Sequence, residues 1–276
     1  ITLATNQMEY LKSLPYDALA VQGGSIYATS LLPATKVQTI NGVQYTATTS
    51  ISYVDDAYDG CGSYPNTTLK QLYCRNYPAP SGAPATDTNA ADYKIAHVSV
   101  TDRGGNELAV VDTQISARVS ETASTTGALF VTVNNSSGAA VSGATVSVVN
   151  STITPNANVS DSTDSNGVAI FYGLPPDSGT DYIITATKSG YSSLVTINAS
   201  GSLQPTYANQ KILSQQSSYV TLTIAGQGAN SLLLETTDTS GSPLGNVKVY
   251  VKGGYKKYKL TSDTAYYYDN FTPTDN

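Results

Sequence analysis

The sequence opens with Ile1-Thr2-Leu3-Ala4-Thr5-Asn6-Gln7-Met8-Glu9-Tyr10-Leu11-Lys12-Ser13-Leu14, the only convincing helical pattern in the chain. Its apolar residues Ile1, Ala4, Met8 and Leu11 recur at i, i+3, i+7 and i+10, so they form one stripe along a helix. Pro15 disfavours the helical conformation just before it, and the helix is therefore expected to end there. Everything afterwards predicts strands and turns. The expected fold class is mainly β, with an N-terminal amphipathic helix packed on an antiparallel sheet.

The composition indicates an extracellular protein of more than one domain. A chain of 276 residues is too long for one small sandwich and fits two or three domains. Only 12% of the residues are charged, so solubility comes mainly from hydroxyl and amide groups. The net charge of −6 argues against nucleic-acid binding. There is no run of about 18 apolar residues, so the sequence predicts no membrane-spanning helix.

The two cysteines, Cys61 and Cys74, bracket a short loop that contains Pro65. A single pair in an otherwise thiol-free chain indicates a disulfide formed in an oxidising compartment. Closing a loop of this size would contribute about 3 kcal/mol in the chain-entropy model. Two free buried thiols remain an alternative, whereas half a zinc site is disfavoured because the chain has one histidine.

Two antiparallel strand pairs are predicted before residue 116. Alternating apolar and polar residues flank Asn41-Gly42, a dipeptide that accepts the positive φ angles of a type I′ hairpin turn. A second pair flanks the turn at residues 104–106. The predicted strands are residues 37–40, 43–53, 93–101 and 107–115. Between the two hairpins lies a long irregular stretch with the cysteine loop.

This order of helix, strands and disulfide-closed excursion resembles the type IV pilins and pseudopilins. The resemblance covers residues 1 to about 120, including a polar helix with Glu9, Leu11 and Lys12 that ends at a short aromatic loop. In that family a hydrophobic half-helix precedes this point and packs the filament core. The resemblance therefore implies that Ile1, Ala4, Met8 and Leu11 belong to an assembly helix. An ordinary amphipathic helix that covers one sheet is the alternative.

The middle of the chain resembles the carboxypeptidase-regulatory-like, or prealbumin-like, sandwich modules of bacterial surface proteins. The resemblance rests on the strand at residues 129–133, the segment 182–191, and turns at Ser137-Gly138 and Asp164–Gly167. These turn residues tolerate the left-handed backbone region. Short alternating strands at regular turn spacing suggest an Ig-like sandwich, closed by residues 219–224.

A second module of the same kind begins near residue 232. Residues 232–251 repeat the opening of the previous module, including a Ser240-Gly241 turn. A half sandwich would leave exposed edges, so we expect the polypeptide to continue, or its remainder to be disordered. The predicted domains are 1–121 (helix, sheet and disulfide loop), 122–226 (sandwich) and 227–276 (incomplete sandwich).

The search for catalytic chemistry finds little. His97 lies in the middle of a predicted strand. A histidine there usually faces solvent or has its hydrogen bonds satisfied, and is seldom a general base. Asp55, Asp56 and Asp59 stand beside a turn and could bind calcium or act as paired glycosidase acids. A solvated loop is the favoured interpretation. We expect no enzyme activity, no cofactor and no metal.

Lysines and tyrosines alternate late in the chain and form a candidate ligand-contact surface. Such a mixture suits an anionic glycan or a nucleic-acid strand, because cations and stacking rings bind both. The alternative is a solvated strand face whose lysines protect a sheet edge. The candidate residues are Lys252, Tyr255, Lys256, Lys257 and Tyr258.

Together these patterns predict a non-enzymatic subunit of an extracellular cell-surface filament, pilin-like and of a minor or tip-like type. Its expected partners are other pilin subunits, with a host-surface glycan or protein as a possible adhesion target. Nucleic acid is not an expected partner, and membrane contact would come only through a segment ahead of Ile1. The alternatives are an adhesin stalk or glycan-binding module unrelated to pili, and the accessory region of an enzyme.

Overall fold

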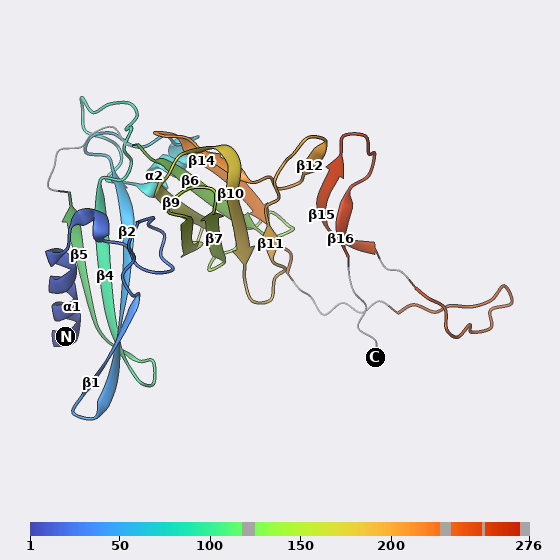
Figure 1. The fold of residues 1–276 in the computed structure, drawn as a ribbon, viewed down its shortest axis with the longest axis horizontal. Coiled ribbons are helices and arrows are strands. Elements are labelled where there is room, and N and C mark those ends of the chain that lie inside the picture. The colour runs from blue at the N-terminus through green and yellow to red at the C-terminus, as the bar shows by residue number, and fades with distance from the viewer. Residues whose placement is uncertain (118–124, 227–232, 250–251, 271–276) are drawn as a thin grey trace.

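The N-terminal part of the chain forms one helix-bearing sheet (Figure 1). A computed structural model describes residues 1–117, 125–226, 233–249 and 252–270, and it is mainly β, as the sequence predicts. The sheet has the order β1-β2-β4-β5, with β3 paired to β2 in parallel. Its elements are α1 (Thr2–Ser13), a 3-10 turn (Tyr16–Ala18), β1 (Thr35–Ile40), β2 (Val43–Asp56), α2 (Thr67–Tyr73), β3 (Cys74–Arg75), β4 (Tyr93–Asp102) and β5 (Glu107–Ser116).

Helix α1 turns its apolar stripe towards this sheet. Ala4, Met8 and Leu11 are buried and share a core cluster with residues of β2 and β4, such as Ala47 and Val98. The helix ends where the sequence predicts, because Leu14 adopts an extended backbone ahead of the proline (φ −82°, ψ 155°). The longest helix that the structure describes is α1, with 12 residues, so none of the described helices could span a bilayer.

Both predicted hairpins are confirmed. Strands β1 and β2 pair antiparallel up to Ile40 opposite Val43, and the turn residues Asn41 and Gly42 have φ angles of 51° and 78°. These are the positive angles that a two-residue type I′ turn requires. Strands β4 and β5 pair around the second predicted turn, and β4 also pairs with β2 along ten residues.

The segment between β2 and β4 is more ordered than its sequence suggested. Asn66 begins the short helix α2, where its side chain accepts a hydrogen bond from the backbone N–H of Leu69 at 2.9 Å. This is the usual role of asparagine at a helix N-terminus. The predicted disulfide between Cys61 and Cys74 is present and joins the loop ahead of α2 to β3. Both ends of α2 are thereby fixed.

The middle of the chain forms two facing sheets, ordered β14-β6-β9 and β11-β10-β7-β8, with β13 paired to β10. Leu129, Phe171, Ile184 and Leu222 are fully buried in the core between them. The predicted closing strand is present and runs parallel to β6. The strands are β6 (Gly127–Asn134), β7 (Thr145–Asn150), β8 (Ala157–Ser162), β9 (Val168–Leu174), β10 (Asp177–Thr187), β11 (Leu194–Val195), β13 (Gln210–Ile212) and β14 (Ser217–Thr223).

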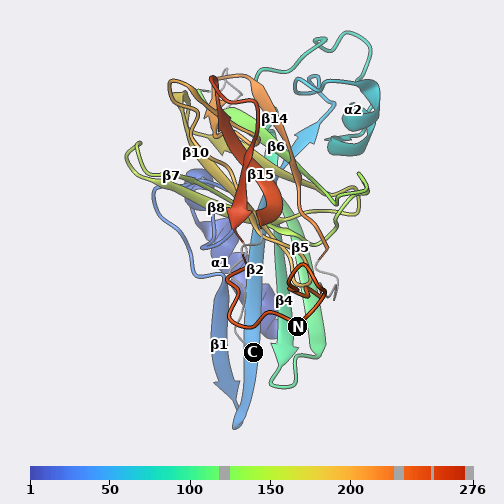
Figure 2. The same cartoon turned by 90° about the vertical axis from the view of Figure 1, so that its right-hand side faces the viewer.

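The C-terminal residues join a separate three-stranded sheet. Strands β15 (Lys252–Leu260) and β16 (Tyr267–Asn270) form a hairpin, and β15 also pairs with β12 (Leu203–Pro205). Figure 2 shows this hairpin in front of the sandwich. The described residues 233–249 contain an isolated bridge between Thr237 and Pro243 and no strand. Leu232, where the second module was expected to start, lies outside the described residues, and so does the predicted domain boundary between residues 121 and 122. The predicted boundary between residues 226 and 227 lies at the edge of another stretch that the structure does not describe.

Candidate functional site

The sheet and the sandwich meet at one outer face of the sandwich. The side chains of β6 point alternately to the two faces of its sheet. Leu129 and Val131 lie in the sandwich core, while Ala128 and Phe130 face the opposite side. That opposite face is covered by residues of the segment between β2 and β4. Phe130 is consequently only 3% exposed although it lies outside the sandwich core. We call this contact the junction.

Four tyrosines surround the Phe130 ring at the junction. Tyr219 stacks on Phe130 with ring centroids 4.8 Å apart, while Tyr64 and Tyr172 approach it edge-on at 5.5 Å and 5.9 Å. Tyr73 of α2 lies at 6.4 Å, also edge-on. These are the offset and T-shaped arrangements that aromatic quadrupoles favour. Tyr64 and Tyr73 belong to the segment between β2 and β4, whereas Tyr172 and Tyr219 belong to the sandwich. The cluster therefore joins the N-terminal sheet to the sandwich.

The tyrosine hydroxyls add polar contacts across the same surface. Tyr73 donates to Asp164 Oδ2 at 3.0 Å, and Tyr219 donates to the backbone carbonyl of Ser63. The hydroxyls of Tyr64 and Tyr172 lie 2.9 Å apart. The junction therefore combines apolar ring area with satisfied hydroxyls, which is the feature that makes tyrosine frequent at interfaces.

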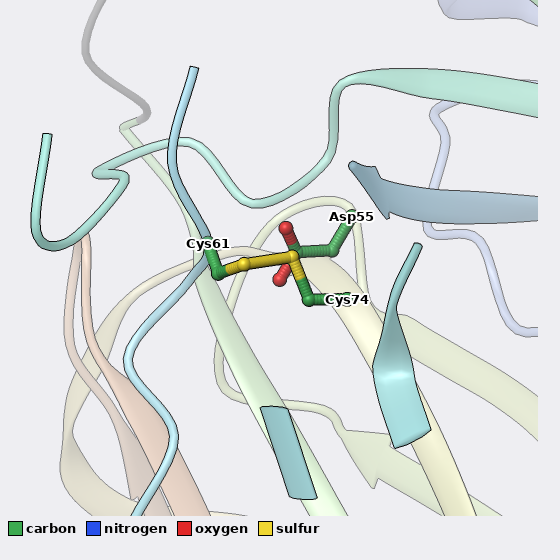
Figure 3. Close-up of side chains that lie close together, drawn as sticks. All are labelled: Asp55, Cys61 and Cys74. Carbon is green, nitrogen blue, oxygen red and sulfur yellow. A yellow bond between two sulfur atoms is a disulfide. The ribbon is translucent and has the colours of Figure 1, made fainter. Parts of the chain in front are cut away.

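Asp55, the penultimate residue of β2, is fully buried beneath the junction. Its Oδ2 accepts hydrogen bonds from the Gly62 N–H at 3.0 Å and from the Tyr64 hydroxyl at 2.5 Å. Since Tyr64 has one hydroxyl proton and donates it to Asp55, Tyr172 is the donor in the tyrosine pair. Figure 3 shows the Asp55 carboxylate beside the Cys61–Cys74 disulfide.

Burial controls the ionisation of Asp55. The pKa of its carboxyl is raised to about 6, mainly by removal from water. The hydrogen bonds from Tyr64 and Gly62 oppose this rise, and the charges of Asp87 and Asp59 add to it. Burial also raises the pKa of Tyr64, and the adjacent carboxylate adds to the effect. Tyr64 therefore remains a hydrogen-bond donor throughout the ordinary pH range.

A cavity of about 290 Å³ lies beside the junction. Its polar wall includes the carboxylate residues Asp55, Asp161 and Asp164, and its aromatic wall includes Tyr53 and Tyr172. Asp55 nevertheless cannot meet a sugar as a glycosidase acid, because its side chain is fully buried and its Oδ2 is already hydrogen-bonded. The arrangement supports a structural role for this carboxylate.

Two other ionisable groups also have structural partners. Burial lowers the pKa of Lys94 to about 8, and its Nζ donates to the carbonyls of Tyr16 and Leu19 at 2.8 Å and 2.9 Å. Lys94 thereby ties the chain that follows α1 to strand β4. His97 Nδ1 lies 2.6 Å from Asp112 Oδ1 on the exposed face of the sheet, which agrees with the solvent-facing position expected for it.

The stripe residues assigned to an assembly helix have two different environments. Ala4, Met8 and Leu11 are buried in this chain's own core, whereas Ile1 is 75% exposed. The periodicity of the apolar residues thus identified the face that packs on the sheet, except that Ile1 at the start of the stripe lies on the surface.

The late lysines and tyrosines are only partly described. The Nζ atoms of Lys256 and Lys259 lie 4.8 Å and 5.5 Å from the centroid of the Tyr266 ring, and the Tyr258 ring stacks on Tyr267. Lys256 and Lys257 line a cavity of about 270 Å³ together with Tyr207 and strand β11. The side chains of Lys252 and Tyr255 lie outside the described part of the chain.

The junction residues were not found by sequence patterns. Tyr64, Tyr73, Tyr172 and Tyr219 are separated by up to 155 positions, and the high tyrosine content gave only a general signal for interfaces. The alternation of β6 is the one local signal that could have found Phe130, because successive residues of a strand face opposite sides.

Replacing Phe130 by alanine is expected to weaken the junction. Truncating a buried phenylalanine costs about 3–5 kcal/mol of stability. Here the lost contacts are those between the N-terminal sheet and the sandwich, outside the core of either. Calorimetry should therefore show the sheet and the sandwich unfolding in separate transitions. The control Tyr58→Ala removes an aromatic side chain that is 83% exposed and should leave the profile unchanged. An unaltered profile for Phe130→Ala would exclude the proposed coupling.

Asp55 should make the protein more stable in acid. Because its pKa is raised in the folded state, the folded protein binds the proton more tightly than the unfolded chain. The free energy of unfolding should therefore fall by about 3 kcal/mol as the pH rises from about 3, below the pKa of the unfolded chain, to about 7, above the pKa in the folded protein. Asp55→Asn keeps an acceptor without the charge and should remove this component.

The measurement is denaturant unfolding of both forms across this pH range, without divalent cations. The difference between them isolates Asp55 from other groups, including Asp87, whose pKa is also raised by burial. Identical pH dependence in the two proteins would contradict the assignment.

No protein-family model matches this sequence, and comparison with curated proteins likewise gives no match. Among solved structures, the chain is similar to BcpA, the major pilin subunit of Bacillus cereus, at 15% identity and a TM-score of 0.27, covering 54% of this chain and 41% of that one. It is also similar to the group B streptococcus pilus 2b backbone protein, at 11% identity and a TM-score of 0.24, covering 70% and 98%. A third similarity is to the Bacillus anthracis TIE protein, at 13% identity and a TM-score of 0.26, covering 49% and 25%. The chain thus spans a quarter of the TIE protein and about two fifths of BcpA, and these scores are too low to transfer a fold or a function.

Proposed function

We propose that this chain is a non-enzymatic structural subunit of an extracellular filament of the type IV pilus kind. In this proposal α1 continues into the filament and contacts other pilin subunits, while the sandwich stands outward for adhesion or surface contact. The observation that carries it is the packing of α1, whose buried stripe of Ala4, Met8 and Leu11 covers the sheet formed by β2 and β4.

The exposed parts of α1 are suited to subunit contacts. Ile1, an apolar residue at the start of the helix, is 75% exposed. Tyr10 on the outward face is 49% exposed, and Glu9 and Lys12 form an exposed ion pair at 2.9 Å. A neighbouring helix could pack on this face without disturbing the protein's own core.

The placement of the sandwich supports an outward-facing module. The N-terminus lies at the lower left of Figure 1, while the sandwich lies on the other side of the sheet and joins it through α2 and its loop. The aromatic junction would hold the sandwich at a fixed angle to a filament. A spacer or adhesive unit requires such a rigid attachment.

The protein purified from its native cells is expected to carry an apolar stretch of about 20–30 residues ahead of Ile1, beginning at a processed and methylated residue. Mass spectrometry of the N-terminal peptide tests this expectation. Antibodies raised against the sandwich should label surface filaments in electron micrographs. An ordinary cleaved signal with no labelled filaments would exclude the filament role.

The second candidate is a glycan-binding surface module unrelated to pili. It is favoured by the cavity at Lys256 and Lys257, where cationic side chains and Tyr207 are brought together. Anionic glycans recognise such sites through charge and ring stacking. If this candidate is correct, Lys256→Ala should lower binding on a glycan array at least tenfold. The control Lys36→Ala, on exposed strand β1, should leave binding unchanged.

A further inference from the structure

We propose that the segment between β2 and β4 holds a calcium ion at Asp59, Asp87 and Asp92. One carboxylate oxygen from each of the three residues lies within 4.8 Å of the others. Asp59 follows β2, whereas Asp87 and Asp92 precede β4, so the fold gathers groups that are 33 positions apart at most.

A cluster of like charges needs a counter-charge. In the described part of the chain, neither Asp59 nor Asp87 makes a salt bridge. The approach of the three carboxylates is nevertheless imposed by main-chain contacts, since the Asp87 N–H donates to the Cys61 carbonyl at 2.8 Å. A bound cation would convert the mutual repulsion of the carboxylates into attraction.

Two buried carboxylate oxygens, one within the cluster and one on the neighbouring Asp55, indicate a missing ligand. Asp87 Oδ2 is buried without a hydrogen-bond partner among the described residues. The same is true of Oδ1 of the fully buried Asp55, whose Oδ2 is already held by Gly62 and Tyr64. Asp55 is close enough to Asp59 and Asp87 for their charges to raise its pKa. An unpaired buried oxygen is costly, and coordination to a cation would satisfy it.

The donor set favours calcium over other metals. Calcium takes six to eight oxygen ligands at about 2.3–2.6 Å in flexible geometry, so oxygens up to about 5 Å apart can share one ion. Magnesium requires shorter and more regular coordination. Zinc would prefer sulfur or nitrogen, but both cysteines are committed to the disulfide.

The backbone around Gly60 packs tightly against the segment that carries Asp87. Gly60 has a φ of 124°, and a Cβ at this position would lie 3.1 Å from the Pro84 carbonyl oxygen and 3.4 Å from Asp87 Cβ. Only glycine lets the two chain segments approach so closely. Backbone carbonyls and water commonly complete calcium coordination spheres.

This inference reverses the expectation from the sequence. The run Asp55, Asp56 and Asp59 was interpreted as a solvated loop, because Asp87 and Asp92 are too distant for a spacing pattern to include them. In the folded chain the site lies in the loop that carries Tyr64 into the junction. Calcium would therefore stabilise both the loop and the attachment of the sandwich.

Calcium chloride titrated into chelator-treated protein tests the proposal directly. Isothermal titration calorimetry should give one site with a Kd of about 10⁻⁴–10⁻³ M, as in extracellular calcium modules. Calcium at ten times the Kd should raise the Tm by about 3–6 °C, and magnesium at the same concentration should raise it less. Absence of both the binding heat and the Tm shift would overturn the proposal.

The variant Asp87→Asn tests whether Asp87 acts as a metal ligand or has only a structural role. The amide oxygen still accepts the bond that Asp87 Oδ1 receives from the Asn89 N–H at 2.8 Å, so the variant loses mainly charge. Without calcium, its Tm should equal or exceed that of the original protein, because repulsion is relieved. With calcium, its affinity should be at least tenfold lower.

The matched control is Asp112→Asn, which removes one exposed carboxylate on β5, beside His97. It should retain the calcium affinity and the Tm shift of the original protein. Unchanged calcium affinity in Asp87→Asn would overturn the proposed site. A lower Tm of Asp87→Asn in chelator together with an unchanged calcium-induced shift would likewise assign Asp87 a purely structural role.

Discussion

The packing of Phe130 among four tyrosines is the interaction on which the arrangement of this protein depends. The outer face of the β14-β6-β9 sheet is apolar at Ala128, Phe130 and Val168, and water would otherwise cover it. The irregular segment between β2 and β4 supplies the covering groups, including Tyr64 and Tyr73. Burying this face therefore orders the segment and attaches the sandwich at the same time.

The polar constraints converge on the same segment. Asp55 is buried at the end of β2, where Gly62 and Tyr64 satisfy one of its oxygens, and the Cys61–Cys74 disulfide closes the loop beside it. A hydrogen-bonded carboxylate and a covalent cross-link thus hold the loop that carries Tyr64 of the aromatic cluster. The proposed calcium ion would add a third constraint, in a region whose chain has little regular secondary structure of its own.

The two faces of α1 connect this architecture to the proposed filament role. One face supplies Ala4, Met8 and Leu11 to the protein's own core, which leaves Ile1 and Tyr10 for contacts outside the chain. The junction is formed by the segment between β2 and β4 and not by α1, so a helix-mediated assembly and an outward sandwich would use different surfaces. This separation is what a structural subunit with an appended module requires.

Local sequence determined the elements whose causes are local. The period of the apolar residues and Pro15 fixed α1, Asn41-Gly42 fixed the first hairpin, and the single cysteine pair indicated its disulfide. The short helix α2 had a local signal in Asn66, but seven residues give too little periodicity to recognise. Residues 233–249 repeat a module's opening pattern without forming its strands, because a strand also needs a neighbour to receive its hydrogen bonds. Only the tertiary structure decided which tyrosines meet at Phe130 and which carboxylates gather around Asp87. Phe130 is tens of positions from each of its tyrosines, and Asp59 is 28 positions from Asp87, so no spacing pattern encodes these contacts.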